Sequence, residues 1–285
     1  MGAEPLFRWE SYSDTLPLEP VPTTTLTADA VSLARELLGA LLAQGGPGGW
    51  SIVRIVETEA YRNDDPASHS FRGTTKRTQV MFGPPGISYV YLIYGMYNCL
   101  NVVCEPAGTG AAVLIRAVEP VWGIGYLWEN RYGGTASFLA GTTLAGRGTP
   151  GHTASASYTR GHTASQSYTP GAAFDPAGLS AKDRKAFYNL TSGPGKLCRA
   201  MSITKEHHNG LDLTDLGGEL VLGRWRDDYA GPRGMRPKSG GVDETERLSH
   251  EWGVVTGPRI GIREGVEQPW RFGLAGNPFL SPYPF

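Results

Sequence analysis

The chain has 285 residues and a net charge of −1, from 26 Lys and Arg against 27 Asp and Glu, so overall charge does not indicate a nucleic-acid partner. Its 39 Gly and 21 Pro residues predict a loop-rich protein, and its three cysteines, with no CxxC pair, favour reduced thiols over a disulfide scaffold. No signal peptide and no run of the roughly 18 apolar residues that span a bilayer are visible, so we expect a cytoplasmic protein with no membrane partner.

The first predicted element is an irregular, Pro- and Thr-rich lead-in over residues 1–26. A helix is expected over Ala28–Ala43, with Thr27 or Asp29 as its N-cap and Gly45 as its stop. The evidence for this helix is the helical spacing of Leu33, Leu37 and Leu41.

Three β-rich runs follow, each bounded by Gly or Pro: Ser51–Thr58, Ser88–Tyr94 and Ala112–Val118. A turn at Tyr94–Tyr97 predicts a β-hairpin with an aromatic tip between the strands Tyr89–Ile93 and Cys99–Cys104. We expect Tyr94 to stand exposed at this tip, while Met96 and Tyr97 pack inside.

Residues 133–181 differ from their surroundings, because they hold only three charges and repeat a ten-residue motif at 151–160 and 161–170. A solvated insertion loop is the expected structure. His152 and His162 could be a metal pair, but no Cys or carboxylate cluster accompanies them, so no metal site is predicted.

Beyond the insertion, residues 180–205 carry six cations against one anion: Lys182, Arg184, Lys185, Lys196, Arg199 and Lys205 against Asp183. A Ser192-Gly-Pro-Gly turn that leads into a helix beside Lys196 is a candidate phosphate clamp, although such turns are common. Residues 256–262 and 268–272 suggest another strand and a final packing segment. No composition break separates domains, so one domain with an insertion is expected over 1–285.

Glu59 is the candidate acid–base residue, since it follows the apolar run of a predicted strand. In such a strand Glu57 and Glu59 share one face and Thr58 takes the other. Arg116 lies in another apolar strand, and buried charges need partners, so we expect it to pair with Glu59. The pattern alone leaves open whether this pair is catalytic or a structural ion pair.

Tyr61 and His69 are flat groups near that carboxylate and could sandwich a nucleobase. Core packing for Tyr61 and a loop role for His69 are the alternatives. Asn101 could bind a base edge or stabilise the hairpin.

Six motifs occur in order along the chain: Glu57-Thr-Glu-Ala-Tyr61, Ala67-Ser-His-Ser70, Met81-Phe-Gly-Pro-Pro-Gly86, Tyr89-Val-Tyr-Leu-Ile-Tyr-Gly-Met-Tyr97, Leu114-Ile-Arg-Ala-Val-Glu-Pro120 and Ser192-Gly-Pro-Gly-Lys-Leu-Cys198. With these motifs the chain resembles a bacterial member of the alkyladenine (3-methyladenine) DNA glycosylase family of the mixed α/β type. The resemblance implies an α+β fold: a single mixed domain with a curved, largely antiparallel sheet, flanking helices and a protruding β-hairpin.

The resemblance also implies roles for individual residues. Glu59 matches the general base that activates water, and Arg116 matches the residue that holds this water with it. The base-binding pocket is implied at Tyr61, His69, Tyr91, Asn101 and Met81, with a last wall at residues 262–268. Tyr94 matches the tyrosine that intercalates into DNA, and Lys196, Lys76 and Arg77 are the implied phosphate-binding residues.

The implied activity is base flipping followed by hydrolysis of the N-glycosidic bond of alkylated or deaminated purines in double-stranded DNA: 3-methyladenine, 7-methylguanine and, as a further candidate, hypoxanthine. No lysine is placed for a Schiff base, so we expect a monofunctional glycosylase without lyase activity. It should be monomeric and nucleoid-associated, with no cofactor.

Two alternatives remain open at this stage. A non-catalytic damage-sensing protein would keep the pocket, but it would be expected to lose the base, whereas Glu59 and Arg116 are both present. A hydrolase of free nucleosides would need neither Tyr94 on a hairpin nor the basic segment 180–205.

Overall fold

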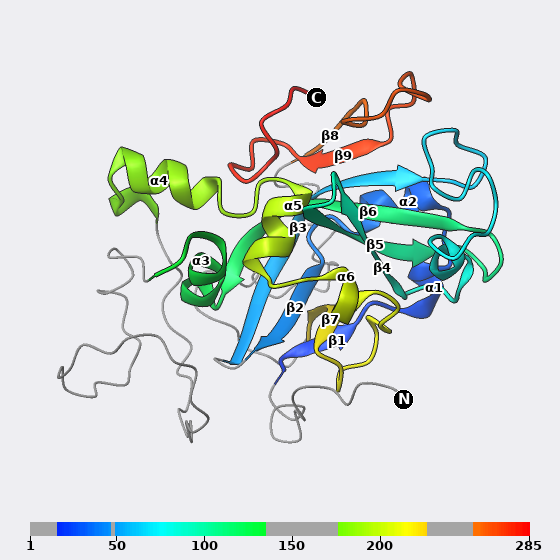
Figure 1. Cartoon of the computed structure of the whole chain (residues 1–285). Coiled ribbons are helices and arrows are strands. Elements are labelled where there is room, and N and C mark those ends of the chain that lie inside the picture. The colour runs from blue at the N-terminus through cyan, green and yellow to red at the C-terminus, as the bar shows by residue number, and fades with distance from the viewer. Residues whose placement is uncertain (1–15, 47–48, 135–175, 227–252) are drawn as a thin grey trace.

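The computed structural model describes residues 16–46, 49–134, 176–226 and 253–285. It has the expected α+β class, with helices packed around one open, antiparallel sheet (Figure 1). The strands are β1 (Leu18–Pro20), β2 (Leu41–Gly46), β3 (Gly49–Tyr61), β4 (Ser88–Ile93), β5 (Tyr97–Cys104), β6 (Ala111–Trp122), β7 (Leu220–Trp225), β8 (Val254–Gly257) and β9 (Arg271–Leu274). The α-helices are α1 (Thr23–Leu26), α2 (Ala30–Glu36), α3 (Ile124–Tyr132), α4 (Ala181–Tyr188), α5 (Pro194–Ala200) and α6 (Lys205–His208), and short 3₁₀ turns lie at Gln79–Phe82 and Pro176–Gly178.

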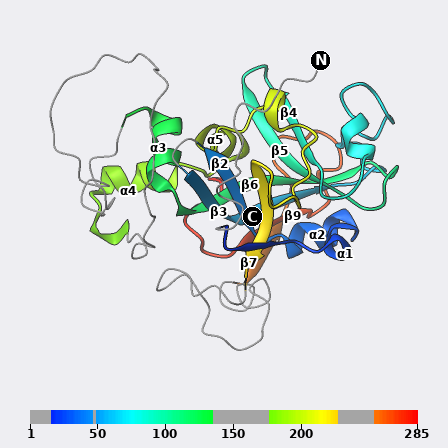
Figure 2. The same ribbon diagram turned by 90° about the horizontal axis from the view of Figure 1, so that it is seen from below.

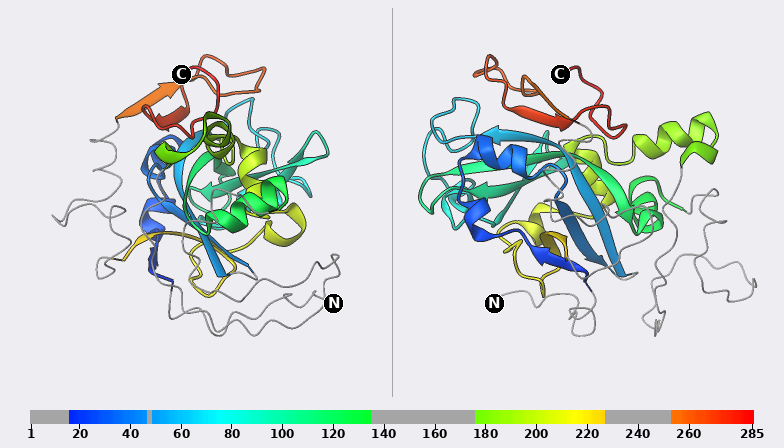
Figure 3. Two further views of the ribbon diagram at one scale, coloured as in Figure 1. Left: turned by 90° about the vertical axis from the view of Figure 1, so that its left-hand side faces the viewer. Right: turned by 180° about the vertical axis from the view of Figure 1, so that it is seen from behind.

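The sheet runs in the order β1-β7-β2-β3-β6-β5-β4, and β9 pairs with both β3 and β8. The short β8–β9 pair and the final segment lie together at one end of the molecule, opposite β1 and β7 (Figure 3). The hairpin of β4 and β5 projects from the body, and helices lie on both sides of the strands (Figure 2).

The strand β3 places the candidate site, because it changes its partner part-way along its length. Its first half pairs with β2 up to Arg54, and its second half pairs with β9 from Glu57 to Glu59. On its other side it pairs with β6, and the register shifts on both sides of Glu57. Such bulges bend a strand and re-aim its side chains. As expected, Thr58 points away from the two glutamates, and its hydroxyl donates to the Ala34 carbonyl of α2 at 2.6 Å.

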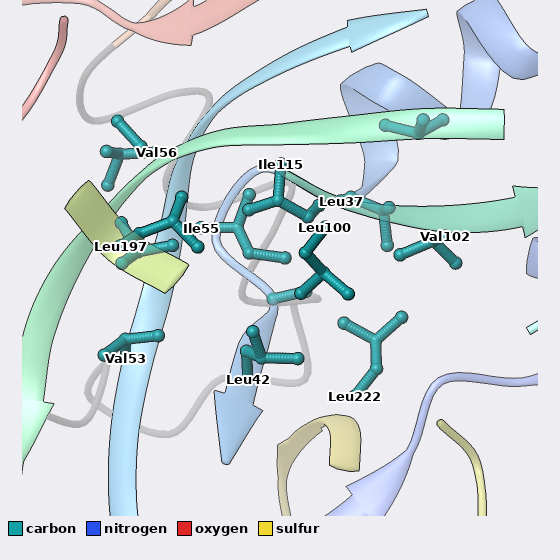
Figure 4. Packing of buried hydrophobic residues seen from close by; sticks show 14 of the residues in the cluster. Leu37, Leu42, Val53, Ile55, Val56, Leu100, Val102, Ile115, Leu197 and Leu222 are labelled. Carbon is teal, nitrogen blue, oxygen red and sulfur yellow. The ribbon is translucent and has the colours of Figure 1, made fainter. Parts of the chain in front are cut away.

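The main core lies between the strands and the helices that cover them. Figure 4 shows side chains from β2, β3, β5, β6 and β7 meeting Leu37, which follows α2, and Leu197 of α5: Leu42, Val53, Ile55, Val56, Leu100, Val102, Ile115 and Leu222. All of these residues are fully buried. Because β3 and β6 cross this core, the side chains that they carry are held on a rigid support.

The expected helix Ala28–Ala43 is only partly correct. Its N-cap is Asp29, whose carboxylate accepts from the backbone of Val31 and Ser32 at 3.1 Å each. The helix ends at Glu36, however, and the chain turns at Gly39, where φ is 90°. It then runs on as β2, which is buried on both faces. A continuous apolar run of this kind has no alternation that distinguishes a strand from a helix.

Other expected elements also differ in detail. The described part of the lead-in is not irregular, since it contains β1 and α1 with Leu18 and Leu26 buried. The strand expected over 256–262 ends at Gly257, and the final segment contains β9. The repeat with His152 and His162 lies outside the described residues, and the single-domain boundary stays a prediction.

Candidate active site

The carboxylate of Glu59 lies at the centre of the candidate site and is fully buried. Its Oε1 accepts from Arg116 Nη1 at 3.2 Å and from the backbone N–H of Ile260 at 2.7 Å. Its Oε2 accepts from the hydroxyl of Tyr61 at 2.8 Å. The predicted pairing of Glu59 with Arg116 is therefore present, and the carboxylate is fixed from three directions.

The electrostatic surroundings make Glu59 a better base than an exposed glutamate. Burial raises the pKa of its carboxyl, and the nearby Glu57 raises it further. The charge of Arg116 and the hydrogen bonds from Ile260 and Tyr61 act in the opposite direction without cancelling this effect. Burial by itself would lower the pKa of Arg116, but Glu59 and Glu57 together raise it, so the guanidinium stays charged.

An aromatic group lies on the hairpin side of the site. The rings of His69 and Tyr91 meet edge to face, with centroids 4.5 Å apart, and Tyr89 lies 5.5 Å from Tyr91. His69 Nδ1 lies 3.0 Å from the Tyr89 hydroxyl, and Arg77 donates to His69 Nε2 at 3.1 Å. The guanidinium of Arg77 also sits 5.3 Å from the centre of the Tyr91 ring. His69 and Tyr91 thus form one rigid corner.

This corner holds His69 in its neutral form. Loss of hydration against the packed rings and the charge of Arg77 lower the pKa of His69 to about 4. Because a guanidinium only donates hydrogen bonds, Nε2 must accept, and the proton therefore sits on Nδ1 toward Tyr89. The resemblance implied a phosphate-binding role for Arg77, and the structure brings its guanidinium to His69.

Tyr61, which donates to Glu59, has its own support. The guanidinium of Arg259 lies 4.8 Å from the centre of the Tyr61 ring and 5.1 Å from that of Trp270. Arg259 is buried, forms a bidentate ion pair with Asp65, and donates to the Ala60 carbonyl at 3.0 Å. Residues 259–260 therefore clamp both Tyr61 and Glu59, which the sequence reasoning missed. A charged residue followed by Ile-Gly-Ile was the available signal.

Residues 262–268, the loop expected as the last wall of the pocket, border a cleft of about 260 Å³. Its lining is largely polar: Arg62, Asp64, Asp65, Pro66, Gly265, Glu267, Gln268 and Trp270. Trp270 connects this cleft to the site, because Arg259 contacts the rings of both Trp270 and Tyr61.

Asn101 and Met81 lie behind the aromatic corner. The side-chain amide of Asn101 donates to the Tyr89 carbonyl at 3.0 Å, across the hairpin pair that the two residues form. This bond matches the hairpin-stabilising alternative and leaves the amide oxygen for other contacts. Met81 is buried and packs in a small cluster with Tyr89, Val103 and Ala112, with Tyr91 against it. Both residues thus shape the wall that carries Tyr91.

The hairpin tip is the most exposed aromatic feature of the described residues. Tyr94 is 80% exposed and adopts φ 54°, Gly95 follows with φ 69°, and the Met96 N–H donates to the Ile93 carbonyl. The expectation that Met96 and Tyr97 pack inside is wrong, since they are 66% and 48% exposed. The turn is too tight for an interior, so Tyr94 and Met96 point outward, while the half-exposed Tyr97 lies against Gly195 of α5.

Lys196 lies in the Ser192–Lys196 turn at the start of α5, as expected. Its Nζ donates to Asn189 and, at 3.4 Å, to Ser192 Oγ. Partial burial and the charge of Arg131 lower the pKa of Lys196. Lys76 is exposed on the loop before the first 3₁₀ turn.

Within the described ranges, no group of three or more His, Cys, Asp or Glu side chains is placed to hold a metal ion. None of the helices in that part of the chain is long and apolar enough to cross a membrane.

Comparison with known proteins identifies the family. The model of the methylpurine-DNA glycosylase (MPG) family matches residues 24–153 and 166–278. A protein of Nitrosospira multiformis with the name "Putative 3-methyladenine DNA glycosylase" is 38% identical over 260 residues, which cover 91% of this chain and 93% of the relative. The chain belongs to the methylpurine-DNA glycosylase family.

Further relatives of this glycosylase carry the same name. One from Bacillus cytotoxicus is 36% identical over 265 residues, which cover 91% of this chain and 98% of the relative. One from Rhodopseudomonas palustris is 36% identical over 269 residues, which cover 94% of this chain and 91% of the relative. The family assignment makes this chain a DNA repair glycosylase, a hydrolase that acts on N-glycosyl bonds and has DNA as its partner.

Proposed function

We propose that this glycosylase flips alkylated or deaminated purines out of duplex DNA and hydrolyses their N-glycosidic bond with a water activated by Glu59. The substrates that we propose are 3-methyladenine and 7-methylguanine, with hypoxanthine as a further candidate. The observation that carries the proposal is a fully buried carboxylate, held by Arg116 and Tyr61 and supported by strand β3.

In the proposed reaction the water oxygen bonds to C1′ of the flipped nucleotide as the bond to the purine nitrogen breaks. Glu59 takes the proton of this water, and the purine leaves with the bonding electron pair. A methylated purine that carries a positive charge leaves as a neutral base. The negative charge of Glu59 also stabilises the oxocarbenium-like sugar in the transition state.

Arg116 serves this step by holding the carboxylate and, with it, the water. Its Nη1 contacts the same oxygen of Glu59 that accepts from Ile260, so the second oxygen has only the Tyr61 hydroxyl as a partner among the described residues. We place the attacking water on the side of that second oxygen. The enzyme then needs no lysine nucleophile, and we propose that it is monofunctional and leaves an abasic site.

The flipped base would lie between Tyr61 on one side and the corner of His69 and Tyr91 on the other. Stacking on aromatic faces tolerates several purines. Asn101 and Met81 would set the depth of the pocket behind that corner. A neutral His69 suits this role, since a positively charged ring would repel a cationic methylated base.

Tyr94 would fill the space that the flipped nucleotide leaves in the duplex. Insertion of a side chain at a base step costs a few kcal/mol, which protein–DNA contacts recover. Lys196 and Lys76 would bind phosphates, as would Arg77 if it leaves His69. We propose that the enzyme acts as a monomer on double-stranded DNA, without a metal or organic cofactor.

The first test is release of free base from a duplex with a single 3-methyladenine or a stable analogue. Glu59→Gln should lower the single-turnover rate by roughly 10²- to 10⁴-fold, because it removes the general base. Lesion binding should survive. A suitable control is Glu119→Gln, which makes the same change at a partly buried carboxylate that pairs with Arg54 on the same two strands.

The control should release base at the wild-type rate. Tight lesion binding without base release by the wild type would instead identify a damage-sensing protein. Release from free nucleosides but not from duplex DNA would indicate a nucleoside hydrolase.

A further inference from the structure

A second buried carboxylate, Glu57, lies on the same face of β3 as Glu59 and is fully buried. Its Oε1 accepts from Arg116 Nε at 3.1 Å and from Arg271 Nε at 2.8 Å. Its Oε2 accepts from the backbone N–H of Ser281 at 2.6 Å. The Ser281 hydroxyl lies 2.6 Å from Oε1 and 2.5 Å from Oε2. Both oxygens of Glu57 are therefore engaged by donors from β6, β9 and the final segment.

Arg116 is shared between the two glutamates. Its Nε points to Glu57, and its Nη1 points to Glu59 at 3.2 Å. A planar guanidinium that is held at two of its nitrogens cannot turn about its own axis. The orientation of Arg116 toward Glu59 is thus fixed by its contact with Glu57.

Arg271 is enclosed on the far side of Glu57. Its Nη1 and Nη2 donate to the carbonyls of Pro284 and Tyr283, both at 2.9 Å, and the ring of Phe285 lies 3.8 Å from its Cζ. In Figure 1 this final segment runs beside β9. The four buried groups carry two positive and two negative charges, so Arg271 supplies the second cation that keeps the cluster neutral while Arg116 contacts both glutamates.

We propose that Glu57 is a positioning residue of the glycosylase reaction, which holds Arg116 against Glu59 and is itself held by Arg271 and Ser281. This inference rests on the proposed role of Glu59 as general base. It assigns a functional task to the final segment of the chain, which lies far from Glu59 in sequence.

The pH dependence of base release reports on this arrangement. The titratable groups that face Glu59 are Glu57 and Tyr61 on β3, Arg116 on β6, and Tyr91 and Cys99 on the hairpin. Burial raises the pKa of both tyrosines, and it raises that of Cys99 to about 11. The two tyrosines and Cys99 therefore stay neutral in the acidic range and Arg116 stays charged, while His69, which packs against Tyr91, has a pKa of about 4. Release should therefore fall at low pH as Glu59 takes up a proton.

The deciding experiment measures single-turnover base release from lesion duplex against pH for Glu57→Gln and Arg271→Met. Glu57→Gln removes a negative charge that raises the pKa of Glu59. The acidic limb of the pH–rate profile, where release falls off, should therefore move to lower pH. The plateau rate should fall roughly 10- to 100-fold, because Arg116 is held less firmly. Arg271→Met removes one of the two cations beside Glu57 and gives the cluster a net negative charge, so it should move the limb to higher pH.

The double variant Glu57→Gln/Arg271→Met keeps the cluster neutral and should return the limb toward its wild-type position. Glu119→Gln serves as the control and should leave the limb in place. Loss of folded protein alone would lower the amount of active enzyme in each variant. It could not move the acidic limbs of Glu57→Gln and Arg271→Met in opposite directions.

If wild type releases base while both single variants keep the wild-type limb, Glu57 has only a structural role and the inference is overturned, although the proposed function stands. If wild type releases no base at any pH, the proposed function itself fails. Ser281→Ala keeps every charge and tests the same arrangement when the charge variants do not fold. It should lower the plateau rate without moving the limb, and an unchanged rate would overturn the inference.

Discussion

At the scale of single residues, the site shows how neighbours decide what an ionisable side chain can do. Burial raises the pKa of Glu59 and lowers that of His69, so in both cases it favours the neutral form. Glu59 keeps three hydrogen-bond donors that favour its charge, whereas His69 faces the cation of Arg77. One group is therefore suited to accept a proton and the other to remain uncharged.

Arg77→Gln should raise the pKa of His69 from about 4, because it removes a nearby positive charge. Burial should still hold it below the usual 6.5. Titration of the His69 ring followed by NMR measures this shift. Lys76→Gln, an exposed cation one residue away, is the control and should leave His69 unchanged.

Two results together would contradict this expectation. The pKa of His69 would stay the same in Arg77→Gln, and the slope of log DNA affinity against log salt concentration would weaken by about one, as expected for the loss of a phosphate contact.

His69 also links pH to stability. Unfolded His69 takes up a proton near pH 6.5 and folded His69 only near 4, so acidification between these values destabilises the folded state.

At the scale of secondary-structure elements, two strands and one hairpin build the site. The bulge in β3 lies where the strand passes from β2 to β9, and it is there that Glu57 and Glu59 both face Arg116 of β6. The hairpin of β4 and β5 carries Tyr91 against His69 and holds Tyr94 at its exposed tip. The tyrosine proposed to bind the base and the one proposed to enter the duplex are thus three residues apart on one hairpin.

Tyr94→Ala should change the free energy of unfolding by less than about 0.5 kcal/mol, because its side chain is 80% exposed. Affinity for lesion duplex should weaken by about 1–3 kcal/mol, the usual loss for one stacking contact. Urea unfolding and equilibrium binding measure the two quantities. Tyr283→Ala removes an exposed ring outside the hairpin and should leave affinity unchanged; equal losses in both variants would contradict the role of Tyr94.

At the scale of the whole molecule, buried ion pairs join residues that lie far apart along the chain. Asp65 binds Arg259, and Glu57 binds Arg271, across nearly two hundred residues or more in each case. Breaking a buried pair leaves a charge without its partner in a medium that solvates it poorly. These pairs fasten residues 253–285 onto the strand that carries Glu59.

Asp65→Asn should lower the free energy of unfolding by about 3–5 kcal/mol, because it leaves the buried Arg259 without a counter-charge. Denaturant unfolding followed by circular dichroism measures the loss. Asp64→Asn is the matched control, since the exposed pair that Asp64 forms with Arg62 should contribute less than about 1 kcal/mol. Equal effects of the two substitutions would show that the buried pair does not fasten the segment.

The sequence by itself determined the local features of this protein. Apolar runs in β3 and β6 predicted strands with charges at fixed places, the Tyr94–Tyr97 turn predicted the hairpin, and the ordered motifs identified the family. The Glu59–Arg116 pair followed from the cost of burying an unpaired charge. Each of these conclusions depends on neighbours along the chain or on a single rule about burial.

Only the tertiary structure decided the partners of those groups. Leu41 and Leu42 fit a helical pattern, but strands on either side of them make β2. Arg77, Arg259 and Arg271 could have faced solvent or phosphate, and packing brings them to His69, Tyr61 and Glu57. The reason is that a buried charge or polar group takes whichever partner the fold places within hydrogen-bond reach, and distance along the chain does not encode that choice.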